Sequence, residues 1–372
     1  MSSKKTYKIA SIPGDGIGPE VISAGIKVLQ KLSTAIGTFD LVFEHLDWSS
    51  NYYKKHKTYL PDDALDQVRR NDAILFGSVG DPDVPDHISL WGLRLALCQP
   101  LQQYANVRPT RILRGITSPL RNCKQGDLDW VIIRENSEGE YSGHGGISHK
   151  GHPWAVATET SIFTREGVER IMRFAFEVAR KREKRHLTVV TKSNAQRNGM
   201  VFWDEVAVEV GREFPDVKVE RMLVDGGFSI FILRNEISPA RPSSIDTIVA
   251  TNLHADILSD LAAALAGSIG IAPTSNLDPT RKNPSMFEPI HGSAFDLVGK
   301  GLANPVGTFW SASEMLRWLG EEDAADWLME AIEAALDGGA KTRDLGGELG
   351  TQEVVDAVCG EIERIVGSKL GK

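Results

Sequence analysis

The chain has 372 residues, of which 41% are hydrophobic and 25% charged, and its formal net charge is −8. This composition is ordinary for a globular protein and argues against intrinsic disorder and collagen-like repeats. The acidic balance disfavours a general nucleic-acid binder, which would usually carry a basic excess. At roughly 150 residues per domain, the length favours two domains.

Strand-like and helical segments alternate along the chain. Apolar runs typical of strands are found at 7–12, 72–77, 187–191, 218–224 and 246–251. Helical patterns are found at 21–32, 165–184, 199–214, 256–265, 311–319, 323–337 and 352–367. This alternation predicts an α/β protein with mostly parallel sheets.

Targeting and disulfide signals are missing from the sequence. The basic residues 1–8 are not followed by the apolar core of a signal peptide, and no window reaches the ~18 apolar residues of a membrane span. Cys98, Cys123 and Cys359 have neither the number nor the spacing of a disulfide framework or zinc site. We therefore expect a cytoplasmic protein with reduced thiols and no membrane contact.

Residues 14–18 (GDGIG) connect the first strand to the first helix. They resemble the GxGxxG dinucleotide fingerprint, but the third glycine comes one residue too early. A tight strand-to-helix turn explains the glycines about as well. The GxxxxGK[ST] motif of P-loop nucleotide hydrolases does not occur.

Asp256 and Asp260 follow the strand-like run 246–251. Their i, i+4 spacing places the two Cβ atoms ~5–6 Å apart on one helix face. Carboxylate oxygens suit Mg²⁺ or Mn²⁺, so we predict a divalent-metal site rather than a solvated acidic face. His254 is interpreted as a packing or cofactor-contact residue, because hard cations prefer oxygen ligands.

Three further residues at strand ends could carry chemistry. Arg134 could hold a carboxylate through two parallel hydrogen bonds, and Tyr141 could supply a proton. Lys192 could act as a general base if it is partly desolvated and near a cation. Read alone, each of the three is an ordinary surface or core residue.

Residues 288–296 and 299–308 form a long glycine-rich stretch. Small residues allow a backbone to approach a ligand closely, and Asp296 could accept hydrogen bonds from a ribose 2′-hydroxyl, which favours NAD over NADP. The alternative is a loop without a ligand, although loops of this length in compact domains tend to be functional.

The five segments around the turn 14–18, Arg134 and Tyr141, Lys192, the aspartate pair and the stretch 288–308 follow one another in this order along the chain. Together they resemble the β-decarboxylating dehydrogenases of 2-hydroxy acids, the isocitrate and isopropylmalate dehydrogenase family. The resemblance extends from residue 9 to about residue 308, and its most specific motifs are NLHADILSD at 252–260 and EPIHGSA at 288–294. The branch of tartrate dehydrogenase and D-malate dehydrogenase (decarboxylating) is the most similar, through segments 252–256, 275–279, 284–288 and 309–311.

The resemblance implies an isopropylmalate dehydrogenase-like two-domain α/β fold, with parallel or mixed sheets flanked by helices, and not a standard Rossmann domain. Residues 1–105 and 267–372 would form a large discontinuous cofactor-binding domain. Residues 106–266 would form a smaller substrate and dimerisation domain. The homodimer would share its active sites, because Lys192 and Asp225 would reach into the partner's site.

The implied activity is an NAD-dependent, metal-dependent oxidation of a small 2-hydroxy diacid such as tartrate or D-malate, with or without decarboxylation. Arg108 and Arg134 would bind the substrate carboxylate, and Tyr141 and Lys192 would form the acid/base pair. The implied ligands of Mn²⁺ or Mg²⁺ are Asp256 and Asp260, together with Asp225 of the partner subunit. The implied NAD contacts are Glu288, His291, Gly292, Ser293, Ala294, Asp296 and Asn304. Family members often respond to K⁺ as well.

Two segments depart from the family pattern. Cys98 stands where the family usually has the first of two substrate-binding arginines, and Arg94, one helical turn earlier, could reach the same pocket. A polar group there fits a hydroxylated diacid better than an isopropyl group. Residues 226–244 are longer and less helical than the short helix that relatives usually have after Asp225.

Two other functions remain open on the sequence. The first is a 3-isopropylmalate or homoisocitrate dehydrogenase of the same family. The second is a metal-dependent phosphate-handling enzyme, which the aspartate pair and the glycine-rich loops permit, but which Asp296 and the missing P-loop disfavour. A binding or scaffold protein gives no reason for lysine, tyrosine and aspartate near separate strand ends.

Overall fold

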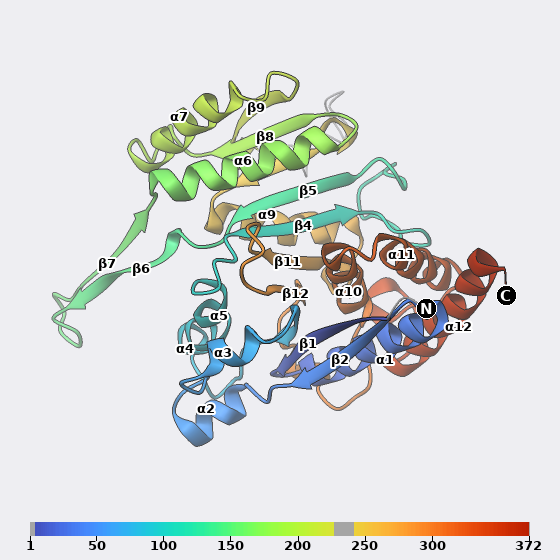
Figure 1. Cartoon of the computed structure of the whole chain (residues 1–372). Helices are drawn as coiled ribbons and strands as arrows, with labels where there is room; N and C mark the ends of the chain where they lie inside the picture. Colours follow the sequence, from blue (N-terminus) through green and yellow to red (C-terminus); the bar gives the residue numbers. More distant parts are fainter. Residues whose placement is uncertain (1–3, 227–241, 372) are drawn as a thin grey trace. The chain divides into compact units, whose positions relative to one another are not determined.

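The computed structural model describes residues 4–226 and 242–371 (Figure 1). Two compact units make up the chain. The first contains Met1–Gln103, Arg111–Pro119 and Ala263–Lys372, and the second contains Tyr104–Thr110 and Leu120–Ala262. Residues 111–119, expected in the smaller domain, thus group with the first unit. Within the divergent stretch 226–244, residues 227–241 lie outside the described residues.

Strands of the first unit lie in the order β2-β1-β3-β12-β11. Their bounds are β1 Lys5–Gly14, β2 Phe39–His45, β3 Ala73–Ser78, β11 Pro273–Leu277 and β12 Ser285–Pro289. β1 is parallel to β2 and β3, β12 is parallel to β3, and β11 is antiparallel to β12. The sheet is therefore mixed, as the resemblance implies.

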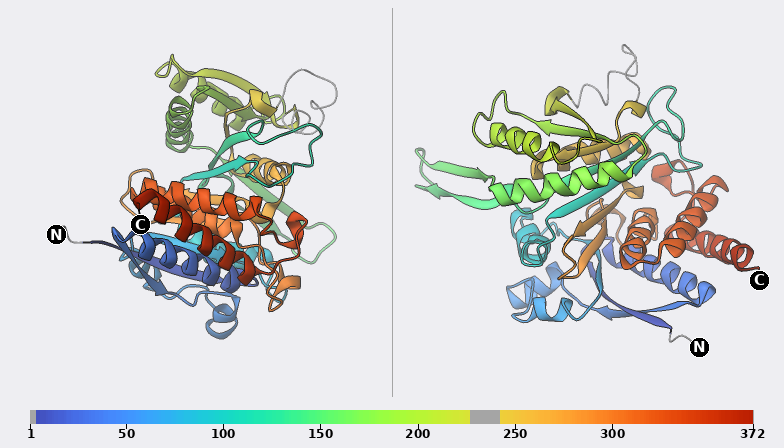
Figure 2. Two further views of the ribbon diagram at one scale, coloured as in Figure 1. Left: turned by 90° about the vertical axis from the view of Figure 1, so that its right-hand side faces the viewer. Right: turned by 45° about the horizontal axis from the view of Figure 1, so that its top comes forward.

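Helices α1, α10, α11 and α12 pack beside one another in this unit (Figure 2). Their bounds are α1 Gly18–Ile36, α10 Val306–Leu319, α11 Glu322–Asp337 and α12 Thr351–Leu370. The shorter helical segments are α2 Ser50–His56, α3 Ala64–Val68, α4 Asp86–Ser89, the π-helix η1 Leu90–Leu95, α5 Ala96–Cys98, and the 3₁₀ turns η3 Ile269–Ile271, η4 Phe295–Leu297 and η5 Arg343–Leu345. One core cluster joins Ile12, Ile74, Phe76, Leu97 and Met286, all at most 1% exposed.

Strands of the second unit lie in the order β4-β5-β10-β8-β9. The bounds are β4 Ala105–Arg111, β5 Asp129–Glu135, β8 His186–Thr191, β9 Lys218–Leu223 and β10 Thr247–Ala250, with helices α6 Arg165–Lys181, α7 Gly199–Gly211 and α9 Asn252–Ala266 and the 3₁₀ turn η2 Pro242–Ser244. β10 is parallel to β5 and β8, and β8 is parallel to β9. Helix α6 begins after Thr164, whose side chain accepts a hydrogen bond from Gly167 N.

An antiparallel hairpin of β6 (Gly139–Ser148) and β7 (Val156–Ile162) projects from the second unit (Figure 1). Ile147, Trp154 and Val156 are 58%, 62% and 55% exposed. A two-stranded hairpin is marginally stable by itself, and these three large apolar side chains on it are open to solvent. This hairpin was not predicted from the sequence.

Membrane-spanning helices and disulfide bonds can be assessed for the residues that the structure describes. None of the helices within 4–226 and 242–371 is both long and apolar enough to cross a bilayer. No disulfide bond joins Cys98, Cys123 and Cys359, all of which lie in those ranges.

Candidate functional site

Two buried arginines of the second unit meet at the first aspartate of helix α9. Arg108, on β4, and Arg134, on β5, are 5% and 3% exposed. Arg134 Nη1 donates to Asp256 Oδ1, and Arg108 Nη2 lies 3.3 Å from the same oxygen. Arg108 Nη1 lies 3.5 Å from Asp260 Oδ1. The structure thus brings together four residues predicted from the sequence to bind substrate or metal.

Strand register and local hydrogen bonds explain this convergence. Arg134 pairs with Ala250 in the parallel β5–β10 ladder, two residues before α9 begins. Its Nε and Nη2 donate to Asn252 Oδ1 at 2.9 and 2.6 Å. Arg108 donates to Asn106 Oδ1 at 3.0 Å and to Ser259 Oγ at 2.5 Å. Asn252 and Ser259 belong to the 252–260 motif, but their role in holding the arginines was not predicted.

The aspartate pair keeps part of its carboxylate surface accessible. The side chains of Asp256 and Asp260 are 36% and 51% exposed. Burial raises the pKa of Asp260, Arg108 opposes this rise, and the charge of Asp256 adds to it. Two accessible carboxylates next to each other are suitable oxygen donors for a hard divalent cation. In residues 4–226 and 242–371, however, no cluster of three or more His, Cys, Asp or Glu side chains forms a complete metal site.

Lys192 and Asp225 lie together at the end of β8. Lys192 Nζ donates to Asp225 Oδ1 at 2.8 Å, and this hydrogen bond lowers the pKa of Asp225. The Asp225 side chain is 65% exposed. Tyr141, the other predicted proton-transfer residue, is half-buried on β6, and its ring centroid lies 5.4 Å from Arg134 Cζ.

The glycine-rich loop of the first unit rests on the turn at residues 14–18. Ile17 N donates to Ser293 O at 2.8 Å. Gly14 and Gly16 have positive φ angles, 70° and 59°, and a Cβ on Gly16 would collide with the Ser293 carbonyl oxygen. Only glycine allows this close approach. The turn therefore supports the loop at 292–296, and the tight-turn interpretation of these glycines accounts for their conformation.

Several groups around this loop suit a dinucleotide. His291 Nε2 is buried, and within the described chain it has no hydrogen-bond partner. Burial lowers the pKa of His291, which favours the neutral imidazole. Asn304 Nδ2 donates to Asp344 Oδ2 at 2.8 Å, while the exposed Asp296 follows the small residues 292–294. Asp344 was not predicted from the sequence, because it lies in a segment near the C-terminus that carries no recognisable motif.

Arg94 and Glu288, predicted to bind different ligands, form a buried ion pair. Arg94 Nε donates to Glu288 Oε1 at 2.8 Å, and Arg94 Nη2 donates to Asn276 Oδ1 at 3.1 Å. Asn276 Nδ2 closes the network with a 2.7 Å hydrogen bond to Glu288 Oε1. The Arg94 and Glu288 side chains are 10% and 8% exposed. This network holds the Glu288 carboxylate in a fixed position near the C-terminal end of β12.

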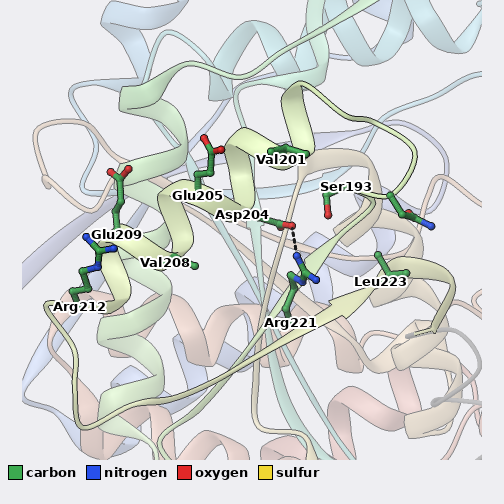
Figure 3. Close-up of a pocket in the computed structure, with 10 residues that line it drawn as sticks. Ser193, Val201, Asp204, Glu205, Val208, Glu209, Arg212, Arg221 and Leu223 are labelled. Carbon is green, nitrogen blue, oxygen red and sulfur yellow. Dashed lines mark hydrogen bonds and ion pairs between the residues drawn. The ribbon is translucent and has the colours of Figure 1, made fainter.

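A separate hollow of about 610 Å³ lies between α7 and β9 (Figure 3). Val201, Val208 and Leu223 line it, and the Asp204–Arg221 ion pair of 3.1 Å crosses it. Val208 is 62% exposed. None of the predicted substrate, metal or cofactor residues lines this hollow.

Comparisons with known proteins agree on one family. A family model for isocitrate/isopropylmalate dehydrogenase matches residues 8–358. A probable tartrate dehydrogenase/decarboxylase of Agrobacterium vitis is 62% identical over 366 residues, covering 98% of this chain and 99% of the relative. The D-malate dehydrogenase (decarboxylating) of Escherichia coli K12 is 45% identical, covering 95% and 98%. The crystal structure of isocitrate dehydrogenase from Methylococcus capsulatus has a TM-score of 0.85 at 31% identity, covering 96% and 99%.

Replacing Arg94 with Leu should lower the free energy of unfolding by about 3–5 kcal/mol, because Glu288 would be left as an uncompensated buried charge. Urea denaturation measures this loss. Arg69→Leu is the matched control, since Arg69 pairs with Asp66 at 3.6 Å on an exposed surface of the same unit and should contribute less than about 1 kcal/mol. Equal losses in both variants would contradict the stabilising role of the Arg94–Glu288 pair.

Proposed function

The chain belongs to the isocitrate/isopropylmalate dehydrogenase family, and on that premise we propose that it oxidises a small 2-hydroxy diacid such as tartrate or D-malate. The reaction depends on NAD and on Mn²⁺ or Mg²⁺, and proceeds with or without decarboxylation. The observation that carries the proposal is the convergence of Arg108 and Arg134 on Asp256. The names of the relatives support the choice of substrate.

Arg108 and Arg134 bind and orient the substrate carboxylate in this proposal. Guanidinium groups form paired hydrogen bonds with carboxylates, which fix the orientation of the bound molecule as well as its charge. Both arginines are already held by side-chain oxygens of Asn106, Asn252 and Ser259. Little side-chain entropy is therefore lost when the substrate binds.

Lys192 and Tyr141 move the protons. Lys192 takes the proton of the substrate hydroxyl as the hydride leaves the same carbon, and Tyr141 returns a proton to carbon after CO₂ departs. Lys192 is hydrogen-bonded to Asp225 in the present arrangement. To act as the base, Lys192 would have to give up this hydrogen bond and lose its own proton, and Asp225 would be one of the residues that hold the metal.

Asp256 and Asp260 would hold the divalent cation, and the loop at 292–296 with Asp296, Asn304 and Asp344 would hold NAD. When bound, the cation would polarise the oxygens of the substrate and NAD⁺ would accept the hydride. Two accessible carboxylates fit the cation, and a buried His291 Nε2 that has no hydrogen-bond partner within residues 4–226 and 242–371 fits the dinucleotide. The arginines, Lys192 and Tyr141 remain responsible for binding and proton transfer.

A homodimer with shared sites completes the proposal. One chain clusters two aspartates, Asp256 and Asp260, among its described residues, and in this proposal Asp225 of a second copy would add a third carboxylate. Asp225, 65% exposed and paired with Lys192, is available to a second copy. The exposed apolar residues of the β6–β7 hairpin and Val208 of α7 provide contact surface.

The purified protein should reduce NAD⁺ with tartrate or D-malate in the presence of Mn²⁺ and K⁺. NADH and CO₂ are measured separately, because oxidation without decarboxylation releases only NADH. Replacing Lys192 with Met should lower kcat by at least about 100-fold, the contribution of a general base. Faster turnover of 3-isopropylmalate than of either diacid would favour the alternative substrate, and no NADH with any hydroxy acid would refute the proposal.

Two inactive variants should complement each other if the sites are shared. Asp256→Asn and Lys192→Met lie in different halves of a shared site, so each mixed dimer would contain one intact site. Random assembly predicts recovery of about a quarter of the wild-type activity when differently tagged chains are co-expressed.

The matched control for complementation is the pair Asp256→Asn and Asp260→Asn. Both changes fall in the half-site of one chain, so a mixed dimer would contain no intact site and should stay inactive. Recovery in this control, or no recovery in the first mixture, would contradict shared sites.

A further inference from the structure

The turn between β5 and β6 is fastened to the first turns of α6. Glu138 accepts two hydrogen bonds from Thr164, one from its backbone N at 2.9 Å and one from its Oγ1. Thr164 Oγ1 accepts a hydrogen bond from Gly167 N at 3.0 Å and so caps the helix. A further contact comes from Arg170, whose Nη2 donates to Ser137 Oγ at 2.8 Å. The start of α6 therefore fixes the position of this turn.

The same turn is braced from the inside by Glu135, which is 2% exposed. The Glu135 carboxylate accepts hydrogen bonds from Ser137 N at 3.0 Å and from Glu138 N at 2.7 Å. These backbone donors satisfy the buried carboxylate locally, as buried polar groups require. The backbone of Glu138 and its side chain are thus held from opposite sides, so that the chain enters β6 along a fixed path.

Tyr141 lies where the ladder between β6 and β7 is irregular. The ladder shifts register within β6, whose successive paired residues are Gly139 with Ile162 and His144 with Thr160. Residues 140–143 therefore stand opposite a single residue of β7. Such an irregularity bends a strand and re-aims its side chains, and it is frequent next to active sites. The course of this stretch consequently depends on the contacts that hold the chain just before it, at Glu138.

We propose that Glu138 is a positioning residue: by fastening the start of β6 to α6, it holds Tyr141 beside Arg134 for proton transfer. This inference rests on the proposed function, which gives Tyr141 its role. The Tyr141 ring centroid lies 5.4 Å from Arg134 Cζ, so a shift of β6 would move the phenol away from the arginine that binds the substrate. A misplacement of roughly 1 Å can cost about 100-fold in rate.

Gly167 offers a way to move the Glu138 carboxylate without removing it. A Cβ on Gly167 would collide with that carboxylate. Gly167 lies within α6, where alanine is a better helix former than glycine. Gly167→Ala should therefore leave the helix at least as stable while it displaces Glu138. A loss of activity in this variant would report the position of Glu138 and not the stability of the fold.

The first test compares the first turnover with the steady state of NADH formation from D-malate. In the proposed mechanism NADH forms before Tyr141 acts, so a misplaced Tyr141 slows only the later turnovers. Glu138→Ala and Gly167→Ala should each lower kcat by about 10-fold or more. Their first turnover should keep the wild-type rate and appear as a burst of NADH. Glu138→Gln, which keeps one acceptor oxygen, should restore part of kcat.

The second test asks whether Glu138 acts through Tyr141. If it does, adding Glu138→Ala to Tyr141→Phe should lower kcat by less than about 2-fold beyond Tyr141→Phe alone, because residues that act as a unit are not additive. Losses that multiply would overturn this inference alone. A wild-type kcat in folded Glu138→Ala and Gly167→Ala enzymes would also overturn it alone.

Glu166→Gln is the matched control. Glu166 is exposed in the same first turn of α6 and carries the same charge near the helix N-terminus. Its replacement should leave kcat and the time course of NADH unchanged, and a loss equal to that of Glu138→Ala would contradict the inference. A wild-type kcat in Tyr141→Phe would refute the role that the proposed function gives to Tyr141, and this inference with it.

Discussion

The compensation of two buried guanidinium charges is the constraint around which the second unit is organised. Arg108 and Arg134 are nearly inaccessible to water, and a buried charge is tolerated only when it is paired and hydrogen-bonded. The first turns of α9 supply both requirements, through Asn252, Asp256 and Ser259. Because Asp256 is also a candidate metal ligand, the same contacts that stabilise the unit define where an anion and a cation can bind.

In the first unit, close backbone contacts between the turn at 14–18 and the loop at 292–296 are the organising constraint. The loop at 292–296 has few side chains of its own to fix it, and it is positioned by a hydrogen bond from Ile17 N and by close packing on Gly16. The Arg94–Glu288–Asn276 network fixes the strand that leads into the loop. Because Ile17 and Gly16 support one side of the loop, its small residues remain available to a dinucleotide. The proposed function gives them this binding role.

Local patterns predicted most of the elements, because their periodicity is encoded by neighbouring residues. The helix expected at 165–184 is α6, Arg165–Lys181, and the strand expected at 187–191 lies in β8, His186–Thr191. The helix expected from residue 256 already begins at Asn252. Its true start was not predicted because its first turn shows little apolar periodicity. The β6–β7 hairpin was missed for a related reason, because glycines and exposed polar residues hide its alternation.

Long-range contacts could not be predicted from spacing. Nothing near Arg94 indicates that its partner is Glu288, 194 residues away, or that Asn276 joins them. The family resemblance placed Arg108, Arg134, Asp256 and Asp260 in one site, and the structure brings those four together. Their roles in binding substrate and metal stay predictions.

In the proposed function, the arginines and aspartates pair with each other until an anionic substrate and a divalent cation replace those contacts together. The most direct test is isothermal titration of Mn²⁺ into the wild-type protein without NAD⁺, with and without saturating D-malate, after correction for Mn²⁺–malate association. A diacid on the arginines frees the carboxylates, so Mn²⁺ should bind about 10-fold more tightly with D-malate, and D-malate equally more tightly with Mn²⁺. An unchanged or weaker Mn²⁺ affinity in the presence of D-malate would contradict the claim.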